Sequence, residues 1–358
     1  LGHRIKEAFA ELEAEYENGC FALNWAAEHD GELGTELGAS LWRFICSRGR
    51  PAEGYQMLHK LSLRKDLPDT LRWGECLFGL AATARNSGML RECREWFERA
   101  AELFERHQHM GALGWVLTND AGLAMETLDY ERALARTLAV EEIDRREGRP
   151  YENALNLGEM AFALAGLGRI EEAVDRMERA FALRLRHEAI QEQGKGYGEM
   201  AKIYMLAGRV NEARPLLEQA VLQLRDGQSN FFLIAALLDL IELQHDEGEP
   251  IHELLKELDD LLKPLPGGTS LARRHLLASR IRLSEGRRRE AGQAISRAIS
   301  EALSCGAYEV LVRAFDAALG LTRAEDLRPE VDAVRSRPDP EAMERVANRL
   351  LIKLATVV

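Results

Sequence analysis

The chain has 358 residues, 46% of them hydrophobic and 30% charged, and this composition excludes a disordered protein. Acidic residues outnumber Lys and Arg by 59 to 47, and the resulting charge of −12 argues against a surface built mainly to bind nucleic acid or an anionic membrane. An odd number of cysteines without a CxxC pair favours a reduced, cytoplasmic protein over a disulfide framework; they are Cys20, Cys46, Cys76, Cys93 and Cys305.

The longest apolar stretch runs from Phe231 to Leu243, contains Asp239, and is shorter than the ~20 residues that a membrane-spanning helix needs. We therefore expect no transmembrane segment and no membrane partner. The chain starts at Leu1 without a methionine and without a signal-peptide pattern. This start favours a fragment of a longer protein or a processed form.

A repeat of about forty residues organises the sequence. Anchor residues recur at steps of 38 to 40 residues, all of them glycine except one leucine: Gly49, Gly88, Leu128, Gly168, Gly208, Gly248 and Gly286. In chain order we expect a helical linker at 1–32, seven repeats at 33–306, and a degenerate last hairpin with a capping helix at 307–358.

Each repeat is predicted to be two antiparallel helices joined by a turn at the anchor. Small residues, which let the helices approach closely, stand seven before the anchor (Ala81, Ala121, Ala161, Ala201), five after it (Gly54, Cys93, Ala133, Ala173, Ala213, Ala291) and twelve after it (Ala100, Ala180, Ala220, Ala298). Bulky residues stand eleven before it: Leu77, Leu117, Leu157, Tyr197 and Leu237. This spacing is similar to that of tetratricopeptide (TPR) repeats, with a longer period than the usual ~34. We predict an all-α, right-handed superhelical solenoid of about seven to eight TPR-like hairpins.

The end of the chain departs from the repeat. Repeat 6 is the weakest, with Glu253 at a normally small position. Asp339 is a predicted helix N-cap with Pro340 in the first turn, and the helix that follows has Met343, Val346, Leu350 and Leu354 on one face. We expect this helix to cap the solenoid, with dimerisation as the alternative.

The segment from Leu12 to Gly54 resembles the linker between the nucleotide-binding core and the helical-repeat arm of bacterial STAND signalling ATPases, such as regulators of the AfsR, LuxR and MalT types. The matching residues are Leu12, Glu13, Glu15, Asn18, Ala22, Leu23, Trp25, Leu41, Trp42, Arg43, Phe44, Arg48, Gly49, Glu53 and Gly54. The resemblance implies a sensor arm that controls an ATPase and an effector domain of the same full-length chain. No GxxxxGK[ST] phosphate loop and no terminal helix-turn-helix occurs, so the arm alone is expected here.

In TPR folds the first helix of each pair lines the concave surface, and this register predicts the binding residues. They are Trp115, Asn119, Gly122, Met125, Glu159, Phe162, Glu199, Lys202, Met205, Asp239 and Glu242. Gly122, Gly158 and Gly198 predict a pit bounded by Trp115, Phe162 and Met125, with close helix packing as the alternative. The acidic row of Glu159, Glu199 and Asp239 favours a basic or amine-bearing partner, unless it is a solvated helix face.

Repeat 7 concentrates arginines, and a docking patch for an acidic surface is predicted at Arg273, Arg274, Arg280, Arg287 and Arg288. A solvated helix face is the alternative, and nucleic acid ranks last.

No pattern of catalytic residues emerges. His107 and His109 have no companion metal ligands at usable spacing, GKGYG at 194–198 leads into a repeat helix without a preceding strand, and the cysteines lack a partner in a shared motif. We therefore expect no enzyme, cofactor or metal. The sequence favours a sensor domain of a signal-responsive transcriptional regulator, with a protein, a peptide or a small-molecule inducer on its concave face. The alternative is a free-standing TPR adaptor or peptide-sensing receptor.

Overall fold

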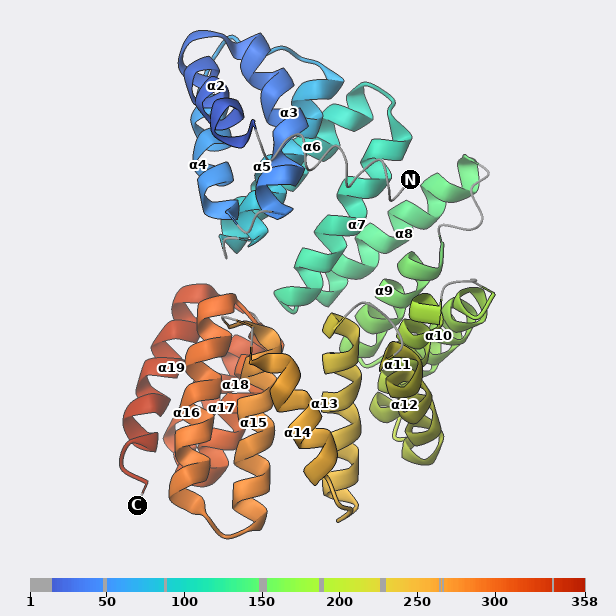
Figure 1. Ribbon diagram of the computed structural model, residues 1–358, viewed down its shortest axis with the longest axis vertical. Coiled ribbons are helices and arrows are strands. Elements are labelled where there is room, and N and C mark those ends of the chain that lie inside the picture. The colour runs from blue at the N-terminus through green and yellow to red at the C-terminus, as the bar shows by residue number, and fades with distance from the viewer. Residues whose placement is uncertain are drawn as a thin grey trace. The chain divides into compact units, whose positions relative to one another are not determined.

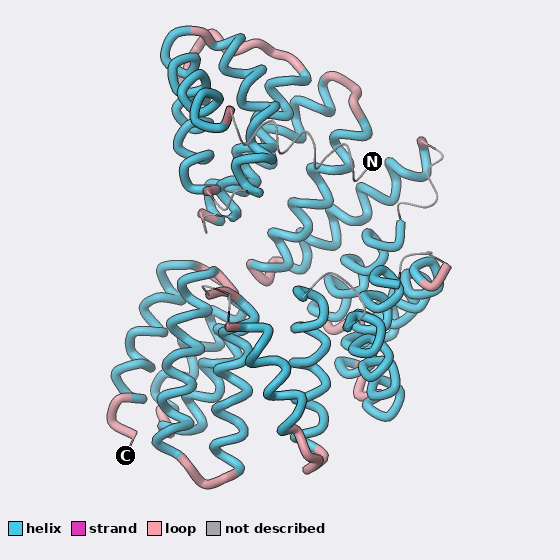
Figure 2. The backbone as a smooth tube through the Cα atoms, in the orientation of Figure 1, coloured by secondary structure: helices cyan, strands magenta, loops and turns pink. Residues whose placement is uncertain are grey.

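The computed structural model describes residues 15–47, 50–86, 89–147, 153–186, 190–225, 230–263, 265, 267–336 and 338–357. Over these ranges the chain forms 18 α-helices, one short 3₁₀-helix and no strand (Figures 1 and 2). The helices are α2 (Tyr16–His29), α3 (Gly31–Ser47), α4 (Pro51–Ser62), α5 (Leu71–Asn86), α6 (Leu90–Arg106), α7 (Met110–Glu126), α8 (Tyr130–Arg146), α9 (Asn153–Gly166), α10 (Ile170–Arg184), α11 (Ile190–Leu206), α12 (Val210–Arg225), α13 (Asn230–Asp246), α14 (His252–Leu262), α15 (Thr269–Ser284), α16 (Arg288–Cys305), α17 (Tyr308–Thr322), η1 (Glu325–Leu327), α18 (Arg328–Ser336) and α19 (Pro340–Leu354). The predicted all-α class is confirmed.

The chain divides into two compact units, and the division falls within α7. The first unit ends at Leu123, and in it α2, α3, α4 and α5 pack on one another while α6 pairs with α5. The second unit starts at Ala124 and holds the remaining hairpins.

In the second unit the helices pack as the predicted hairpins. α9 pairs with α10, α11 with α12, α13 with α14, and α15 with α16. The first helices also contact their successors, because α9 contacts α11, α11 contacts α13, α13 contacts α15, and α15 contacts α17 (Figure 1). We call the surface formed by α9, α11, α13 and α15 the first-helix face. It corresponds to the surface that the sequence predicts as the binding side.

The predicted anchors adopt the left-handed backbone conformation that ends a helix. Gly168, Gly208, Gly248 and Gly286 have φ between 72° and 76°, and Leu128 takes the same role with φ 58°. After each of them the next N–H donates to a carbonyl five residues back, as from Arg209 to Tyr204 at 2.8 Å, which is the Schellman pattern. The anchors Gly49 and Gly88, like Leu12, Glu13 and Arg48 of the opening segment, lie outside the described residues.

One hairpin offers a matched test of this turn. We expect Gly208→Ala to lower the free energy of unfolding by about 1 kcal/mol, because a side chain at φ 72° is strained while the space around it is open. Gly198→Ala, inside α11, should raise it by about the same amount, since its Cβ would meet only the Ala220 Cβ, at 3.8 Å. Urea unfolding monitored by circular dichroism measures both. Equal signs for the two variants would contradict the turn assignment.

The predicted small positions lie in the core. All four alanines seven residues before the anchor are fully buried: Ala81, Ala121, Ala161 and Ala201. At the Gly54 position an added Cβ would come within 2.8 Å of the Ile45 Cγ2. Helices therefore approach closely where the sequence places its smallest side chains.

The C-terminal helix α19 starts as predicted. The Asp339 side chain accepts a hydrogen bond of 2.8 Å from the Ala342 N–H, and Pro340 stands in the first turn. The predicted apolar face is buried against α16, α17 and α18. None of the described helices is long and apolar enough to cross a bilayer.

Candidate functional site

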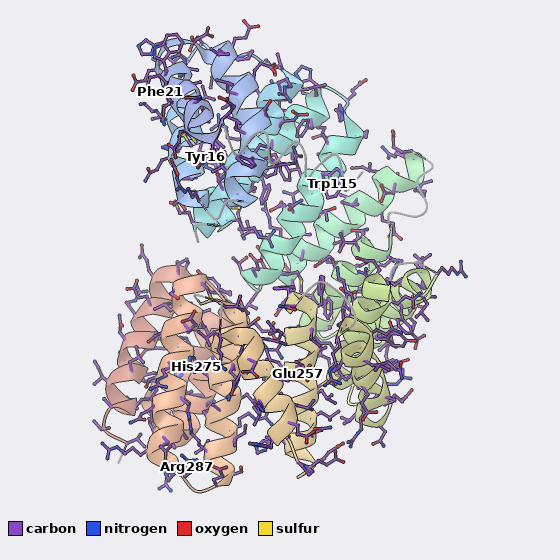
Figure 3. All side chains as sticks on the ribbon, viewed as in Figure 1. Tyr16, Phe21, Trp115, Glu257, His275 and Arg287 are labelled. Carbon is purple, nitrogen blue, oxygen red and sulfur yellow. The ribbon has the colours of Figure 1, made fainter. Side chains whose placement is uncertain are left out.

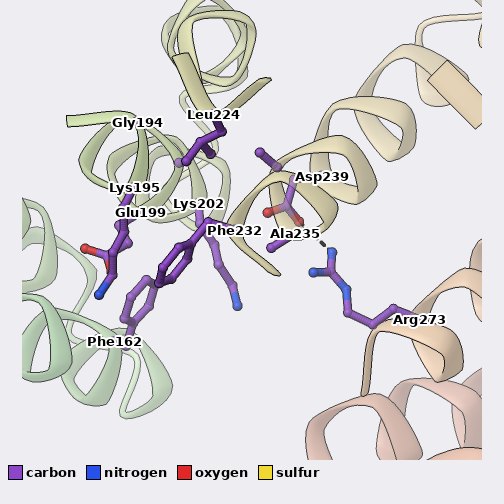
Figure 4. A pocket seen from close by; sticks show the side chains of 12 residues that line it. Phe162, Gly194, Lys195, Glu199, Lys202, Leu224, Phe232, Ala235, Asp239 and Arg273 are labelled. Carbon is purple, nitrogen blue, oxygen red and sulfur yellow. Dashed lines mark hydrogen bonds and ion pairs between the residues drawn. The ribbon is translucent and has the colours of Figure 1, made fainter. Parts of the chain in front are cut away.

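The first-helix face of the second unit contains a small hollow (Figure 4). Its volume is about 120 Å³, well below the ~300–1,000 Å³ of pockets that enclose a drug-sized ligand. It is open to solvent and therefore suits one side chain of a larger partner better than a whole metabolite. Its lining residues come from α9, α11, α12, α13 and α15: Phe162, Gly194, Lys195, Gly198, Glu199, Lys202, Leu224, Phe232, Ala235, Ala236, Asp239 and Arg273.

Four predicted binding residues line this hollow. They are Phe162, Glu199, Lys202 and Asp239, which come from three different hairpins. Glu242 lies one turn beyond Asp239 on α13 and is buried, with 9% of its surface exposed. Glu159 and Met205 are half-buried and are not among the lining residues.

The other predicted residues do not line the hollow. Trp115, labelled in Figure 3, is 66% exposed, and the Asn119 amide donates to its carbonyl at 2.8 Å. The Cβ position of Gly122 is 3.2 Å from an Arg85 nitrogen. These three residues belong to the first unit. Met125, at the start of the second unit, packs on the core cluster around Ala133.

Two of the three glycines of the predicted pit, Gly158 and Gly198, lie in the second unit, and their surroundings differ. The Cβ position of Gly158 is 3.4 Å from the Glu199 Oε2, whereas that of Gly198, which lines the hollow, is 3.8 Å from the Ala220 Cβ. The missing side chain at Gly158 makes room for the Glu199–Arg184 ion pair, and that at Gly198 lies towards the neighbouring helix α12.

The Glu199 carboxylate is held by two cations. The Arg184 Nη2 lies 3.0 Å from its Oε2, and the Lys195 Nζ lies 3.6 Å from its Oε1. The Arg184 side chain is only 6% exposed and also donates to the Glu192 carboxylate at 2.9 Å. Arg184 comes from the second helix of the preceding hairpin, where the first-helix register does not predict it.

Asp239 and Glu242 belong to a larger cluster on the same face. The Arg273 Nη2 donates to the Asp239 Oδ1 at 2.6 Å (Figure 4). Glu242 lies within ion-pair distance of three guanidinium groups, those of Arg273 at 3.7 Å, Arg280 at 3.6 Å and Arg313 at 3.0 Å. Burial alone would lower the pKa of Arg273, but the two carboxylates outweigh it and raise that pKa, so Arg273 stays charged.

Two lysines of the hollow lie over aromatic rings. The Lys202 Nζ is 5.4 Å from the centre of the Phe162 ring, and the Lys195 Nζ is 5.0 Å from that of Phe232. Such cation–π contacts stabilise by roughly 0.5–1 kcal/mol at exposed sites. Phe232 was not predicted from the sequence, because it falls outside the register of first-helix positions.

The arginines of the predicted docking patch do not present free guanidinium groups on one surface. Arg273 lines the hollow, Arg274 pairs with Asp259 at 2.7 Å, and Arg280 pairs with Asp246. Arg287 pairs with Glu285 and Glu290, and Arg288 donates to the Leu321 carbonyl. Each has a partner within the second unit, and for four of the five this partner is a carboxylate.

We expect His275, between these arginines on α15, to make the stability of the second unit depend on pH (Figure 3). Burial lowers its pKa, and the positive charges of Arg297 and Arg274 lower it further. In the unfolded chain the pKa of a His is about 6.5, so the unfolded chain binds the proton more tightly than the folded chain does. Acid therefore favours unfolding. We expect the wild type to lose more stability than His275→Gln as the pH falls from about 7 to about 5. Urea unfolding across this range tests it, and parallel curves would contradict it.

The described residues contain no group of three side chains able to hold a metal ion. The cysteines are free, and burial raises the pKa of Cys76 to about 12, which disfavours its reactive thiolate. The described residues of the site provide paired charges, two aromatic rings and a small hollow.

No protein-family model matches the sequence, and no curated protein matches it. Solved structures do resemble the fold. A Rap protein in complex with competence and sporulation factor has a TM-score of 0.66 at 12% identity, covering 98% of this chain and 99% of its own. The apo form of RapI has a TM-score of 0.61 at 12% identity, covering 75% and 98%. TPR-like repeats of a kinesin light chain protein from Podosopora anserina have a TM-score of 0.46 at 18% identity, covering 53% and 94%. The chain has the fold of TPR-like helical solenoids.

Proposed function

We propose that the chain is a non-catalytic interaction domain that binds a protein or peptide segment on the first-helix face of its second unit. The observation that carries the proposal is the hollow between α9, α11 and α13, where Phe162, Glu199, Lys202 and Asp239 come together. Its open form and small volume suit an anchor side chain of an extended partner. Helical solenoids use such faces as extended binding surfaces.

The context of this binding is a further part of the proposal. The opening segment around Trp25 and Trp42 supports a sensor arm of a STAND-type regulator, in which an inducer or partner on this face controls an ATPase and an effector. A phosphate-binding loop encoded in frame upstream of Leu1 would support that context. A start codon directly before Leu1 would contradict it.

The alternative context is a free-standing peptide-sensing TPR receptor. The full-length likeness to the Rap protein complexed with competence and sporulation factor favours it. Both contexts use the same face, so the binding experiment comes first.

The test measures the thermal unfolding midpoint of the full chain with fractions of a cell extract. A ligand that binds only the folded state raises the midpoint, and at ~100 times its dissociation constant contributes ~2.7 kcal/mol. We expect a protease-sensitive fraction to raise the midpoint of the wild type and of Phe21→Ala, but not of Phe162→Ala. Phe21 is the matched control because it is 74% exposed and belongs to the first unit.

Other outcomes decide between the alternatives. A shift caused only by the small-molecule fraction and lost in Phe162→Ala would replace the peptide with an inducer. No shift with any fraction, or equal shifts in all three proteins, would overturn binding at the hollow.

A further inference from the structure

The charges that line the hollow are unevenly paired. Its two carboxylates both have cation partners, since Glu199 lies against Arg184 and Asp239 against Arg273. Lys202 contacts the Phe162 ring and has no carboxylate partner among the described residues. The hollow is therefore lined by two carboxylates and three cations, and the charge left without a counter-ion is a lysine ammonium.

The unused hydrogen-bonding groups of the hollow also favour an anionic partner, because they are donors of Lys202. An ammonium has three N–H donors, and the ring face over which Lys202 lies uses none of them in a strong hydrogen bond. The Glu199 Oε2, by contrast, is buried beneath Arg184 and inaccessible to a partner. A partly desolvated donor without an acceptor favours an anionic group in its neighbourhood.

The apolar part of the hollow lies next to this charge. The rings of Phe162 and Phe232 lie next to each other at the hollow, which Gly198 and Ala235 also line (Figure 4). A volume of about 120 Å³ holds one side chain with part of its neighbour, not a larger ligand.

We propose that the hollow binds an acidic side chain of an extended peptide segment, with the carboxylate at Lys202 and an adjacent apolar side chain on Phe162 and Phe232. This inference rests on the proposed function and names the chemistry of its partner. It reverses the preference for a basic partner that the acidic row of the sequence suggests, because Arg184 and Arg273 already pair with Glu199 and Asp239, the two carboxylates of that row that line the hollow.

The test uses pools of nonapeptides with acetylated and amidated ends, identical except for a central Glu, Asp, Gln, Asn or Lys, on the full chain at low salt. We expect the Glu and Asp pools to bind about tenfold more tightly than the matched amide pools, the difference that one charge-assisted hydrogen bond makes. Lys202→Glu should transfer the preference to the Lys pool, and Lys202→Arg should keep it. Lys256→Glu is the control, because Lys256 is exposed on α14, outside the hollow.

Equal binding of the Glu and Gln pools, or a Glu preference that survives Lys202→Glu, would overturn the inference. If binding depends on Phe162 but not on the charge of the central residue, the proposed function stands and only this inference fails. Tighter binding of pools with a free C-terminal carboxylate, whatever their central residue, would replace the side chain by the chain end. If no pool binds, the acidic-peptide assignment fails, and the extract experiment decides separately whether the face binds protein.

Discussion

Glu242→Ala should lower the free energy of unfolding of the second unit by about 3 kcal/mol. The Glu242 side chain is 11% exposed and lies among three guanidinium groups, so its removal takes a counter-charge from Arg273 and Arg280, which keep Asp239 and Asp246, and from Arg313. Arg313 loses the one carboxylate with which it pairs in the described part of the chain. Urea unfolding monitored by circular dichroism measures the loss.

The control for this prediction is Asp246→Ala, one turn along α13. Asp246 also pairs with Arg280, but its side chain is 55% exposed. An exposed pair of this kind contributes at most about 1 kcal/mol. Similar losses in the two variants would show that burial of Glu242 does not determine its contribution.

The sequence predicts the turns and the core because each depends on the type of residue at a single position. A left-handed residue follows each first helix from α7 to α15, and glycine adopts that conformation without strain, so the anchors mark the turns directly. Even Leu128, the one anchor with a side chain, keeps the conformation because the spacing of the hairpins requires it. Ala161 and Ala201 mark close helix contacts for an equally local reason, their size.

The sequence predicts the candidate site only in part, because the charged residues of the site pair with residues that are distant in the chain. The first-helix register predicts Phe162, Glu199, Lys202 and Asp239, which come from three successive hairpins and meet at the hollow. It does not predict Arg184, which reaches Glu199 from a second helix through the space at Gly158. The forty-residue period predicts on which face of a hairpin a residue lies, but it does not predict which residue of another helix pairs with it.

Arg313 shows the same limit over a greater distance. It lies in the segment that departs from the repeat, 71 residues from Glu242 in the chain, yet their side chains are 3.0 Å apart. The length and flexibility of an arginine side chain allow it to find partners that no periodic pattern contains. The register thus predicts the first-helix positions of Glu199 and Asp239, while the net charge around them depends on arginines outside the register.

Leu237→Ala should cost about 3 kcal/mol, the typical loss for removing a fully buried leucine side chain. Leu237 is 0% exposed and lies in the core shared by α11, α12, α13 and α14, at the bulky position eleven residues before its anchor. Leu222→Ala, on the neighbouring α12, removes the same atoms from a side chain that is 55% exposed and should change stability by less than about 0.5 kcal/mol. Equal effects would refute the repeat register at this hairpin.

The location of the Leu237→Ala effect tests the solenoid itself. In a stacked repeat each hairpin is stabilised mainly by its neighbours, so a defect loosens the adjacent hairpins first. Helix α13 packs on α11, α12, α14 and α15, whereas α19 packs on α16, α17 and α18. Amide hydrogen exchange in the variant should therefore quicken most in α11 to α15 and least in α19. Uniform acceleration across the second unit would instead indicate a single cooperative core, in which occupation of the hollow would stabilise the whole unit at once.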